Sequence, residues 1–392
     1  MQNMRLPVGW KVDKLENLVS FTRGSEPGSD SYTDDDAYTR FLRVSDISGT
    51  SKEKVYTAAN NLKLVDKGDL LITLDGTPGI VSDQFEGAIS SGIRKIYIIN
   101  DELLQDYLKF YLRSDNVQRI IYKYATGATI LHASKSIQYI EVIIPPLETQ
   151  KKIVEILEGA EKALEKKKEA IRLVDELVKS RFIEMFGDPM LNPMRWNKEE
   201  LINVCDTIVD CPHSTPKYIS ENTGFMCIRT TIIKPNCIDW EKIEYISQVD
   251  YENRIKRYKP KRGDIIYSRE GAILGIAALI DKECNVSLGQ RLMLLSANRN
   301  ILNERYLCYA MNADGIARQV RDKIGGSASP HINVADVKNF KILVPPLDKQ
   351  IEFASFMKQV DKLKFEMEES LKELENNFNS LMQSAFNGEL FK

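Results

Sequence analysis

The sequence lacks the motifs of the common enzyme classes. It contains no GxxxxGK[ST] phosphate loop, no HExxH zinc motif, no GxSxG nucleophile elbow and no GxGxxG placed to open a helix after a strand. An Asn- or Asp-Pro-Pro-aromatic signature of amino-methylating enzymes is also missing. These absences argue against nucleotide hydrolysis, zinc proteolysis, esterase chemistry and self-sufficient methylation, and we expect no catalytic site.

Residues that bind metals are few and poorly spaced. All six cysteines lie beyond residue 204, and no two of them form a CxxC pair. Cys205, Cys211 and His213 could be imagined as a metal cluster, but reduced and partly buried side chains are the preferred interpretation. We therefore expect no metal site.

Only three histidines occur, and two of them match across the chain. His132 and His331 each follow a glycine, Gly127 or Gly326, by five residues. They could contact a ligand. Without paired cysteines or a carboxylate pattern around them, a histidine in a turn or in the core is the preferred interpretation.

Long apolar runs and an excess of positive charge are absent as well. No stretch of 18 uncharged apolar residues occurs, and the opening MQNMRLPVGWKV has no apolar run of a signal peptide. We therefore expect a cytoplasmic protein that does not contact membranes. The net charge of −2 also argues against indiscriminate binding of polyanions, so a nucleic-acid site is expected to depend on local charge.

What the sequence does contain is a long internal repeat. The stretch IPPLETQKKI at 144–153 returns as VPPLDKQIEF at 344–353. The matched segments also include PVGW with PMRW, DKGDLLIT with KRGDIIYS, and SGIRKI with LGQRLM. Since 392 residues exceed what one hydrophobic core usually supports, the repeat predicts two similar domains.

Short strand patterns alternate with helical patterns inside each repeat, which predicts an α+β fold. We expect strands at 41–47, 69–74 and 94–99, and helices at 102–124 and 303–323. The Gly-Asp pairs at 68–69 and 263–264 are interpreted as structural turns into strands. The predicted boundaries are 1–146 for a first mixed α/β domain, 147–188 for a long helix, 189–346 for a second domain and 347–392 for a second long helix.

Each double proline is typical of a helix start, because proline tolerates the first turn and an early carboxylate suits the positive helix end. Behind it, apolar residues alternate at spacings of four and three, which indicates a coiled coil. The seam consists of Ile153, Leu157, Leu164, Ile171, Val174 and Val178, and of Phe353, Met357, Val360, Met367, Leu371, Leu374 and Phe378. Lys167 and Lys364 are its polar exceptions.

The two seams predict that the long helices pack on each other. Helix one must carry the chain from the first domain to the second, so pairing within one chain requires an antiparallel coiled coil. Such a coil would relate the domains by a pseudo-two-fold axis. Pairing between two chains is the alternative.

Local charge singles out the second domain. Residues 189–346 carry a net charge of +4, whereas residues 1–146 carry −2. The stretch RIKRYKPKR interleaves basic residues with a tyrosine, as phosphate-binding segments do, although a solvated charge run is an equally simple interpretation. Candidate DNA-contacting residues there are Arg229, Thr230, Thr231, Arg254, Lys256, Arg257, Lys259, Lys261, Arg262, Arg269 and Arg291, with the hydroxyls of Ser327–Ser329 as further donors.

The first domain offers fewer candidates. They are Arg40, Arg43, Arg94, Lys95 and Lys135, with the hydroxyls of Thr126 and Thr129 as further donors. Arg94 and Arg291 match across the repeat, which suggests a shared structural or backbone role instead of sequence readout. The two domains differ most at 20–60 and 205–260, so we expect them to read two different targets a fixed distance apart.

Together these features resemble the DNA specificity subunit of a Type I restriction–modification enzyme. The resemblance rests on the duplicated PPLETQ and PPLDKQ helix starts, the long helices, the W…GD…G(I/Q)R order in each domain and the terminal Gly388-Glu389-Leu390. It implies two target-recognition domains on an antiparallel helical spacer, which read a bipartite site in double-stranded DNA.

The resemblance also implies partners and excludes catalysis in this chain. Two modification subunits would dock around the helices, and a restriction and motor subunit would join for cleavage. S-adenosylmethionine, ATP and Mg²⁺ would belong to those partners. The alternative function is a non-catalytic coiled-coil scaffold that binds only proteins, and a self-sufficient methyltransferase is disfavoured by the missing motifs.

Overall fold

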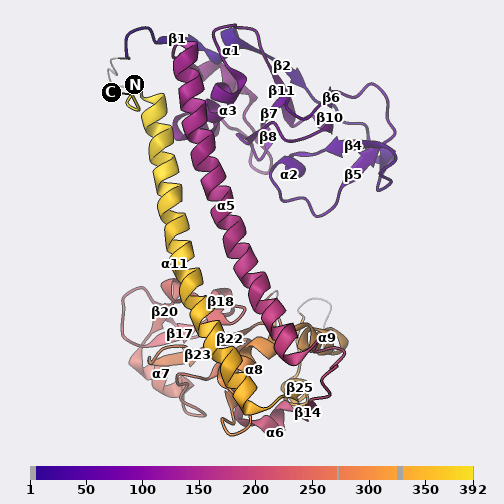
Figure 1. Ribbon diagram of the computed structural model, residues 1–392, viewed down its shortest axis with the longest axis vertical. Coiled ribbons are helices and arrows are strands. Elements are labelled where there is room, and N and C mark those ends of the chain that lie inside the picture. Colours follow the sequence, from indigo (N-terminus) through magenta and orange to yellow (C-terminus); the bar gives the residue numbers. More distant parts are fainter. Residues whose placement is uncertain (1–5, 272, 325–329, 392) are drawn as a thin grey trace. The chain divides into compact units, whose positions relative to one another are not determined.

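The computed structural model describes residues 6–271, 273–324 and 330–391 (Figure 1). The chain forms two compact units, and the long helices α5 (Leu147–Phe186) and α11 (Leu347–Phe386) contribute to both. Unit 1 combines residues up to Glu169 with residues from Glu368 onward, and unit 2 runs from Ala170 to Met367. Each unit therefore contains one globular part and a half of each long helix.

One antiparallel sheet and one mixed sheet build the globular part of unit 1. The four-stranded sheet has the order β2-β11-β7-β9, with β2 Val19–Arg23, β7 Leu70–Thr73, β9 Val81–Ser82 and β11 Ile93–Ile98. The five-stranded sheet has the order β3-β5-β4-β10-β6, with β3 Tyr32–Thr33, β4 Thr39–Leu42, β5 Val55–Thr57, β6 Leu64–Val65 and β10 Gly87–Ile89. Strand β10 runs parallel to β4.

Two strand pairs and several short helices complete unit 1. The pairs are β1 Lys11–Lys14 with β13 Glu141–Ile144, and β8 Asp75–Gly76 with β12 Leu131–His132. The helices are α1 Leu15–Leu18, α2 Val44–Ile47, α3 Gln105–Arg113 and α4 Asp115–Lys123, with 3-10 turns at Ser29–Ser31 and Ser134–Tyr139.

Unit 2 repeats these sheets. One has the order β15-β24-β21-β22, with β15 Cys205–Asp210, β21 Ile265–Ser268, β22 Ala277–Leu279 and β24 Leu292–Ala297. The other has the order β16-β20-β17-β23, with β16 Tyr218–Ile219, β17 Met226–Ile228, β20 Glu244–Ile246 and β23 Val286–Leu288. Strands β17 and β23 are parallel, as β4 and β10 are in unit 1.

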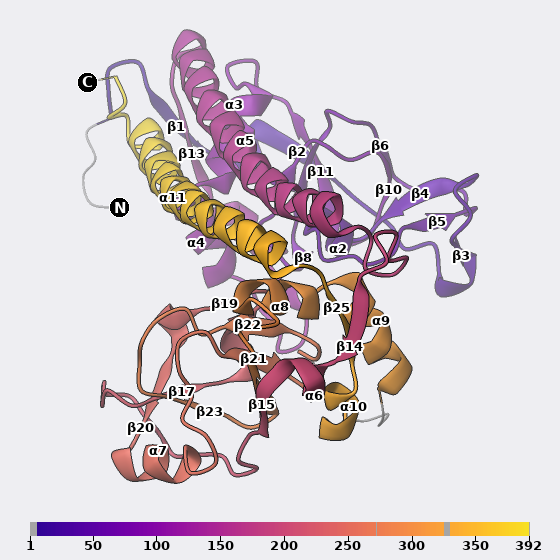
Figure 2. The ribbon, with the colours of Figure 1, turned by 60° about the horizontal axis from the view of Figure 1, so that its bottom comes forward.

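Two strand pairs and several short helices complete unit 2. Strand β14 (Asn197–Glu200) pairs with β25 (Lys341–Val344), as β1 pairs with β13 in unit 1, and β18 (Ile233–Lys234) pairs with β19 (Cys237–Ile238). The helices are α6 Leu201–Val204, α7 Gln248–Arg254, α8 Glu304–Met311, α9 Asp314–Lys323 and α10 Val334–Lys338, with 3-10 turns at Thr230–Ile232 and Trp240–Lys242. Helix α8 lies against β22 and α9 against β25 (Figure 2). The prediction of two similar mixed α/β domains is confirmed.

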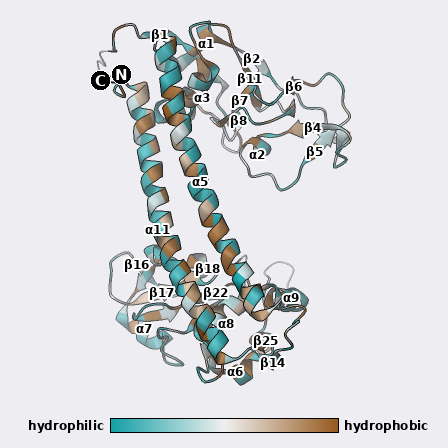
Figure 3. Ribbon diagram, viewed as in Figure 1, coloured by the Kyte–Doolittle hydropathy of each residue, from teal (hydrophilic) through white to brown (hydrophobic). Residues whose placement is uncertain are grey.

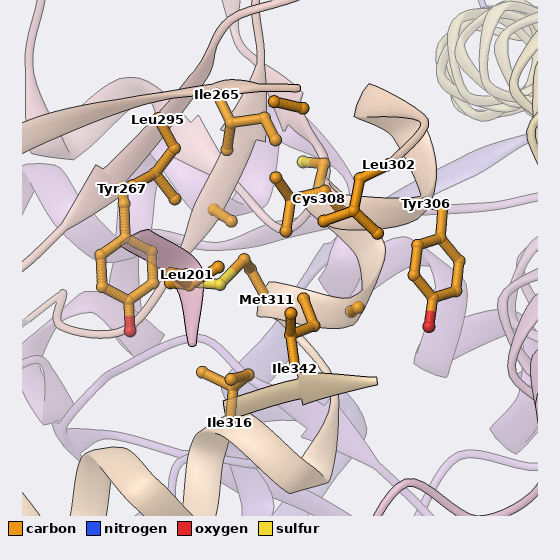
Figure 4. Close-up of a cluster of buried hydrophobic side chains, with 14 of the residues drawn as sticks. Leu201, Ile265, Tyr267, Leu295, Leu302, Tyr306, Cys308, Met311, Ile316 and Ile342 are labelled. Carbon is orange, nitrogen blue, oxygen red and sulfur yellow. The ribbon is translucent and has the colours of Figure 1, made fainter. Parts of the chain in front are cut away.

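The main core of unit 2 lies between the four-stranded sheet, helices α8 and α9, and the ends of the long helices. Figure 4 shows part of this cluster, with side chains from both the sheet and the helices pointing toward one another. The labelled residues are Leu201, Ile265, Tyr267, Leu295, Leu302, Tyr306, Cys308, Met311, Ile316 and Ile342. Because these side chains come from several strands and helices, the burial of their apolar area joins those elements of unit 2 in one core.

The Gly-Asp pairs form turns that lead into the central strands. Gly68 and Gly263 have φ values of 102° and 94°, a left-handed conformation that glycine adopts without steric cost. The carboxylate of Asp69 accepts a hydrogen bond from the Asp66 amide at 2.8 Å, and Asp264 accepts one from the Lys261 amide at 2.9 Å. These internal bonds explain the motif as a structural turn, as predicted.

Three secondary-structure predictions need correction. Residues 41–47 do not form one strand, because β4 ends at Leu42 and α2 follows at Val44. The side chain of Asp46 accepts a hydrogen bond from the Arg43 amide at 2.8 Å and so stabilises the start of this helical turn. The predicted helix at 102–124 is interrupted at Ser114, whose extended backbone (φ −67°, ψ 147°) separates α3 from α4. The predicted helix at 303–323 is interrupted at Asn312 and Ala313, where the extended backbone of Ala313 (φ −79°, ψ 161°) separates α8 from α9.

Helices α5 and α11 begin directly after Pro145-Pro146 and Pro345-Pro346, and each is 40 residues long. Hydrophilic and hydrophobic residues alternate along both of them (Figure 3). Seven seam residues are at least nine-tenths buried: Ile153, Leu157, Leu164, Val178, Phe353, Met357 and Val360. The other seam residues are half-buried, and so are Lys167 and Lys364.

The two long helices contact each other in opposite directions within each unit. In unit 2, Lys364 pairs with Asp175 at 2.6 Å, and the rings of Phe353 and Phe182 meet edge to face with centroids 5.4 Å apart. In unit 1, Lys168 pairs with Glu375 at 3.0 Å. Residue numbers fall along α11 as they rise along α5, so the pairing is antiparallel and lies within one chain.

Neither long helix has the composition of a membrane span, because charged residues recur throughout both. Among the residues described here, no helix combines the length and apolar character that a bilayer crossing requires.

Replacing a seam side chain by alanine should destabilise the chain more than the same replacement at an exposed position of the same helix. Phe353 is fully buried among Phe182, Phe186 and Tyr309, so Phe353→Ala should lower the free energy of unfolding by about 3–5 kcal/mol. Phe365 on the same helix is 64% exposed, and Phe365→Ala should change it by less than about 0.5 kcal/mol. Urea denaturation followed by circular dichroism measures both, and equal effects would contradict this assignment of the seam.

Candidate nucleic-acid interface

Arg40 and Arg43 of unit 1 hold the segment around α2. The Arg40 guanidinium lies 2.5 Å from the carboxylate of Asp46 and donates to the carbonyl of Val55 at 2.6 Å. Arg43 donates to the hydroxyl of Ser51 at 3.0 Å and to the carbonyl of Glu53 at 3.1 Å. Much of the hydrogen-bonding capacity of both residues is therefore used inside the domain.

Arg94 lies in a polar cluster at the turn between β7 and β8. Its guanidinium donates to the Ser91 carbonyl at 2.5 Å and the Ser134 hydroxyl at 3.2 Å, and it lies 3.3 Å from a carboxylate oxygen of Asp75. Burial lowers the pKa of Arg94, although the charge of Asp75 acts in the opposite direction. The other carboxylate oxygen of Asp75 is 2.8 Å from Nδ1 of His132, whose side chain remains exposed. Arg94 therefore positions this turn, and His132 is the accessible member of the cluster.

The two lysine candidates of unit 1 differ in their surroundings. Lys95 contacts the carboxylate of Asp69 at 2.5 Å. Burial opposes ionisation of Asp69, but the hydrogen bonds from Lys95 and from the Asp66 amide, together with the charge of Lys95, outweigh burial and lower the pKa of Asp69. Lys135 is exposed and makes no ion pair within the part of the chain that the structure describes. Of these two lysines, Lys135 is therefore the one whose charge is not shared with a carboxylate of the described residues.

In unit 2, Arg229 contacts the carboxylate of Glu244 and the aromatic ring of Tyr218. It donates to both carboxylate oxygens of Glu244, at 2.7 and 2.9 Å, and its guanidinium lies 5.0 Å from the centroid of Tyr218. The hydrogen bond to Glu244 raises the pKa of Arg229. Thr230 and Thr231 follow in a 3-10 turn, and Thr231 is exposed.

The basic run of unit 2 separates into a buried residue and an exposed cluster. Arg254 is 9% exposed and donates to the carbonyl of Leu288 at 2.7 Å and to that of Ser214 at 2.8 Å. The other five basic residues are exposed and make no ion pair with any described residue. We call these five the basic loop: Lys256, Arg257, Lys259, Lys261 and Arg262.

The tyrosine within this run anchors the basic loop. Tyr258 packs against the apolar cluster of the second sheet, and its hydroxyl lies 3.2 Å from the carboxylate of Asp264. Because the tyrosine is directed inward, it stabilises the loop and does not interleave with the basic side chains at the surface. The loop thus presents charge on a fixed backbone.

A second polar cluster lies at the opposite end of β21. The guanidinium of Arg269 is 2.9 Å from the carboxylate of Asp210 and also pairs with Glu270, and Asp210 lies 3.2 Å from Nε2 of His213. The Arg269 amide donates to the carbonyl of Arg291 at 3.0 Å. Arg269 is therefore held by carboxylates, whereas Arg291 is exposed and adopts a positive φ of 68°.

The sequence candidates of unit 2 do not form a single patch. The basic loop precedes the first residue of β21, and Arg269 follows its last residue. Four residues in a strand span about 13 Å, so the basic loop and the Arg269 cluster lie at separate ends of the sheet. Ser327–Ser329 and Gly326 lie outside the described residues.

Sequence patterns did not reveal the carboxylates that hold the arginines, nor the aromatic side chains that pair with lysines. In unit 1, the rings of Tyr124 and Tyr139 stack with centroids 3.8 Å apart, and Lys123 lies 5.3 Å from the Tyr124 ring. In unit 2, Lys282 lies 4.2 Å from the Trp240 ring. Paired aromatic and basic residues are a usable signal for nucleic-acid contact, but their sequence separation concealed the Tyr124–Tyr139 stack.

Of the residues considered as metal ligands, Cys211 is buried and His213 pairs with a carboxylate. Cys205, Cys211, Cys227, Cys284 and Cys308 are free thiols among the described residues, and burial raises the pKa of Cys211. His213 is directed to Asp210, and no group of three or more metal-ligating side chains was found within the ranges that the structure describes.

Known proteins with similar sequences and folds share this organisation. The family of the Type I restriction modification DNA specificity domain matches the chain twice, over residues 7–172 and 193–376. The MjaVIII type I restriction enzyme specificity subunit of Methanocaldococcus jannaschii is 23% identical over 380 residues, which cover 93% of this chain and 88% of that protein.

Two solved structures have a similar fold. The S subunit of a Type-I restriction-modification system from M. genitalium has a TM-score of 0.56 at 13% identity, over 98% of both chains. A chain from a structural study of complex assembly in the type I R-M system has a TM-score of 0.57 at 20% identity, over 98% of this chain and 100% of that one. The family match extends over both repeats, and the chain belongs to the Type I restriction modification DNA specificity family.

Proposed function

We propose that this chain is the DNA-recognition subunit of a Type I restriction–modification system and reads a bipartite target. The observation that carries the proposal is the duplication of one domain fold on two antiparallel helices. Two similar domains held by a common spacer suit two half-sites separated by a fixed gap. Residues 1–146 and 189–346 are the proposed recognition domains, and 147–188 and 347–392 are the proposed spacer helices.

Catalysis belongs to partner subunits in this proposal. The chain is the non-catalytic member of the complex, and two modification subunits bind S-adenosylmethionine and methylate DNA, while a restriction and motor subunit uses ATP and Mg²⁺. Four large apolar side chains on the long helices of unit 2 are 47% to 64% exposed, namely Leu173, Leu177, Leu363 and Phe365. Exposed apolar side chains on helices suit partner docking. We place the complex in the cytoplasm.

The DNA contacts are proposed from exposure and charge. The accessible donors in unit 2 are the basic loop, Thr231 and Arg291, and those in unit 1 are Lys135 and His132. Arg40, Arg43, Arg94, Lys95, Arg229, Arg254 and Arg269 are proposed to position these surfaces, since carboxylates or backbone carbonyls hold them.

A DNA reader and a protein scaffold differ in two measurable properties. Expressed with its cognate modification subunit, the chain should co-purify with that subunit and retain duplexes of one sequence from a random pool. Co-purification with proteins alone, without selection among duplexes, would favour a scaffold. Binding of S-adenosylmethionine by the pure chain would instead indicate a self-sufficient methyltransferase.

Removing charge from the basic loop should weaken DNA binding without changing its specificity. Replacing Lys256, Lys259 and Lys261 by Gln should flatten the dependence of log K on log salt by roughly one unit per lost phosphate contact. Fluorescence anisotropy across a salt series measures this slope. The matched control replaces the exposed Lys349, Lys358 and Lys372 of α11, and equal slopes for the two triple variants would show that the basic loop faces solvent.

Shortening both long helices should shorten the gap in the target. Deleting residues 165–171 and 368–374 removes one heptad from each helix, or about 10 Å, which corresponds to roughly three base pairs. The half-sites should stay the same, because the globular parts are untouched. Deleting 165–171 alone is the control, and it should abolish binding by misaligning the seam. An unchanged gap in the double deletion would contradict the proposal that the length of the long helices sets the gap.

A further inference from the structure

The glutamine of the PPLETQ motif joins three parts of unit 1. Gln150 is fully buried in the first turn of α5. Its amide nitrogen donates to the carbonyls of Glu102 and Pro145 at 2.7 and 2.8 Å, and its amide oxygen accepts from the amide of Leu104 at 2.9 Å. One side chain thus links the helix, the end of β13 and the segment that enters α3.

The glutamine of PPLDKQ makes the same three bonds in unit 2. Gln350 is also fully buried, and it donates to the carbonyls of Ile301 and Pro345 at 3.0 and 2.7 Å. It accepts from the amide of Asn303, the residue that caps α8, at 2.8 Å. The identical bonding in both repeats indicates a constraint on geometry that both domains share.

Buried tyrosines also bind the strand that leads into each double proline. Tyr107 of α3 donates to the carbonyl of Ile143 at 2.7 Å, and Tyr306 of α8 donates to that of Leu343 at 3.0 Å. Both carbonyls lie two residues before the first proline of the pair. The last strand, the double proline and the long helix are therefore anchored to one helix of the globular part in each unit.

Glutamine side chains are seldom fully buried in folded proteins. An apolar side chain of similar size would pack there without the need to satisfy an amide, but it could not bond to three backbone groups at fixed angles. The Pro145 carbonyl lies at the bend between β13 and α5, whereas the Glu102 carbonyl and the Leu104 amide belong to the segment that enters α3. A change in the angle of that bend would break at least one of the three bonds.

We propose that Gln150 and Gln350 are positioning residues for split-site recognition. Each sets the angle at which its recognition domain leaves the spacer helix, and so the length of gap that the protein accepts. This inference rests on the proposed function. One extra base pair shifts a half-site by about 3.4 Å and rotates it by roughly 35°, so a domain free to tilt would accept neighbouring gaps that a locked domain rejects.

The test uses the complex of the full chain with its modification subunits and a series of duplexes. The duplexes keep both half-sites, as found by mapping methylated bases, and vary the gap by one and two base pairs. For the unaltered complex, a gap changed by one base pair should reduce the methylation rate at least about tenfold, comparable with one mismatched pair. For Gln150→Met, the reduction should fall to about twofold, while mismatches within a half-site are rejected as before.

Two controls separate positioning from stability. Gln359→Met makes the same replacement at an exposed site of α11 and should leave the gap profile unchanged. Hydrogen exchange at the Leu104 amide should accelerate in Gln150→Met and not in Gln359→Met. If Gln150→Met does not fold, Gln150→Asn keeps the amide but shortens its reach by one methylene and should broaden the profile in the same way.

The outcomes are distinct for the inference and for the function on which it rests. An equal loss of rate at every gap, or an unchanged profile in a folded variant with accelerated exchange at Leu104, would overturn the positioning role. If the unaltered complex shows no dependence on the gap, the proposed function itself fails. A broadened profile with intact half-site selection supports both.

Discussion

The pairing of two long helices through an apolar seam is the constraint on which the rest of the structure depends. Phe182 and Phe186 of α5 meet Phe353 of α11 in unit 2, and Ile153 and Leu157 share a core with Met382 and Phe386 in unit 1. These contacts merge the seam with the core of each globular part, because Phe386 also packs on Tyr107 and Tyr111. Neither unit is complete without residues from both long helices.

Charge is distributed so that structure and binding use different basic residues. Carboxylates hold several arginines, such as Arg229 on Glu244 and Arg269 on Asp210, at positions where a guanidinium can fix a loop. The exposed lysines of the basic loop have no such partners among the described residues. A chain with a net charge of −2 can therefore present a basic surface locally, and salt should weaken its binding to a polyanion.

Much of the fold could be predicted because the sequence contains an internal repeat. Matched segments located the central strands and turns, and the seam spacing indicated which faces of the helices meet, including the half-buried Lys167 and Lys364. The strand predicted at 41–47 was wrong because Asp46 caps a helical turn there, a contact that strand propensity does not report. Local periodicity also concealed the break at Ser114.

The candidate site was harder to predict for a physical reason. Whether an arginine reaches solvent depends on carboxylates and carbonyls that the fold brings to it from distant positions, as Arg254 shows with the carbonyls of Leu288 and Ser214. Composition identifies a basic run but not which members of it are buried. The same limit applies to Tyr258, which anchors the loop from within.

Mapping methylated bases across the genome of a host that carries this chain and its modification subunit tests the central claim most directly. The account predicts methylation within two different half-sites, on opposite strands, separated by a constant gap of unspecified bases. Methylation at a single continuous sequence, or half-sites separated by variable gaps, would contradict it.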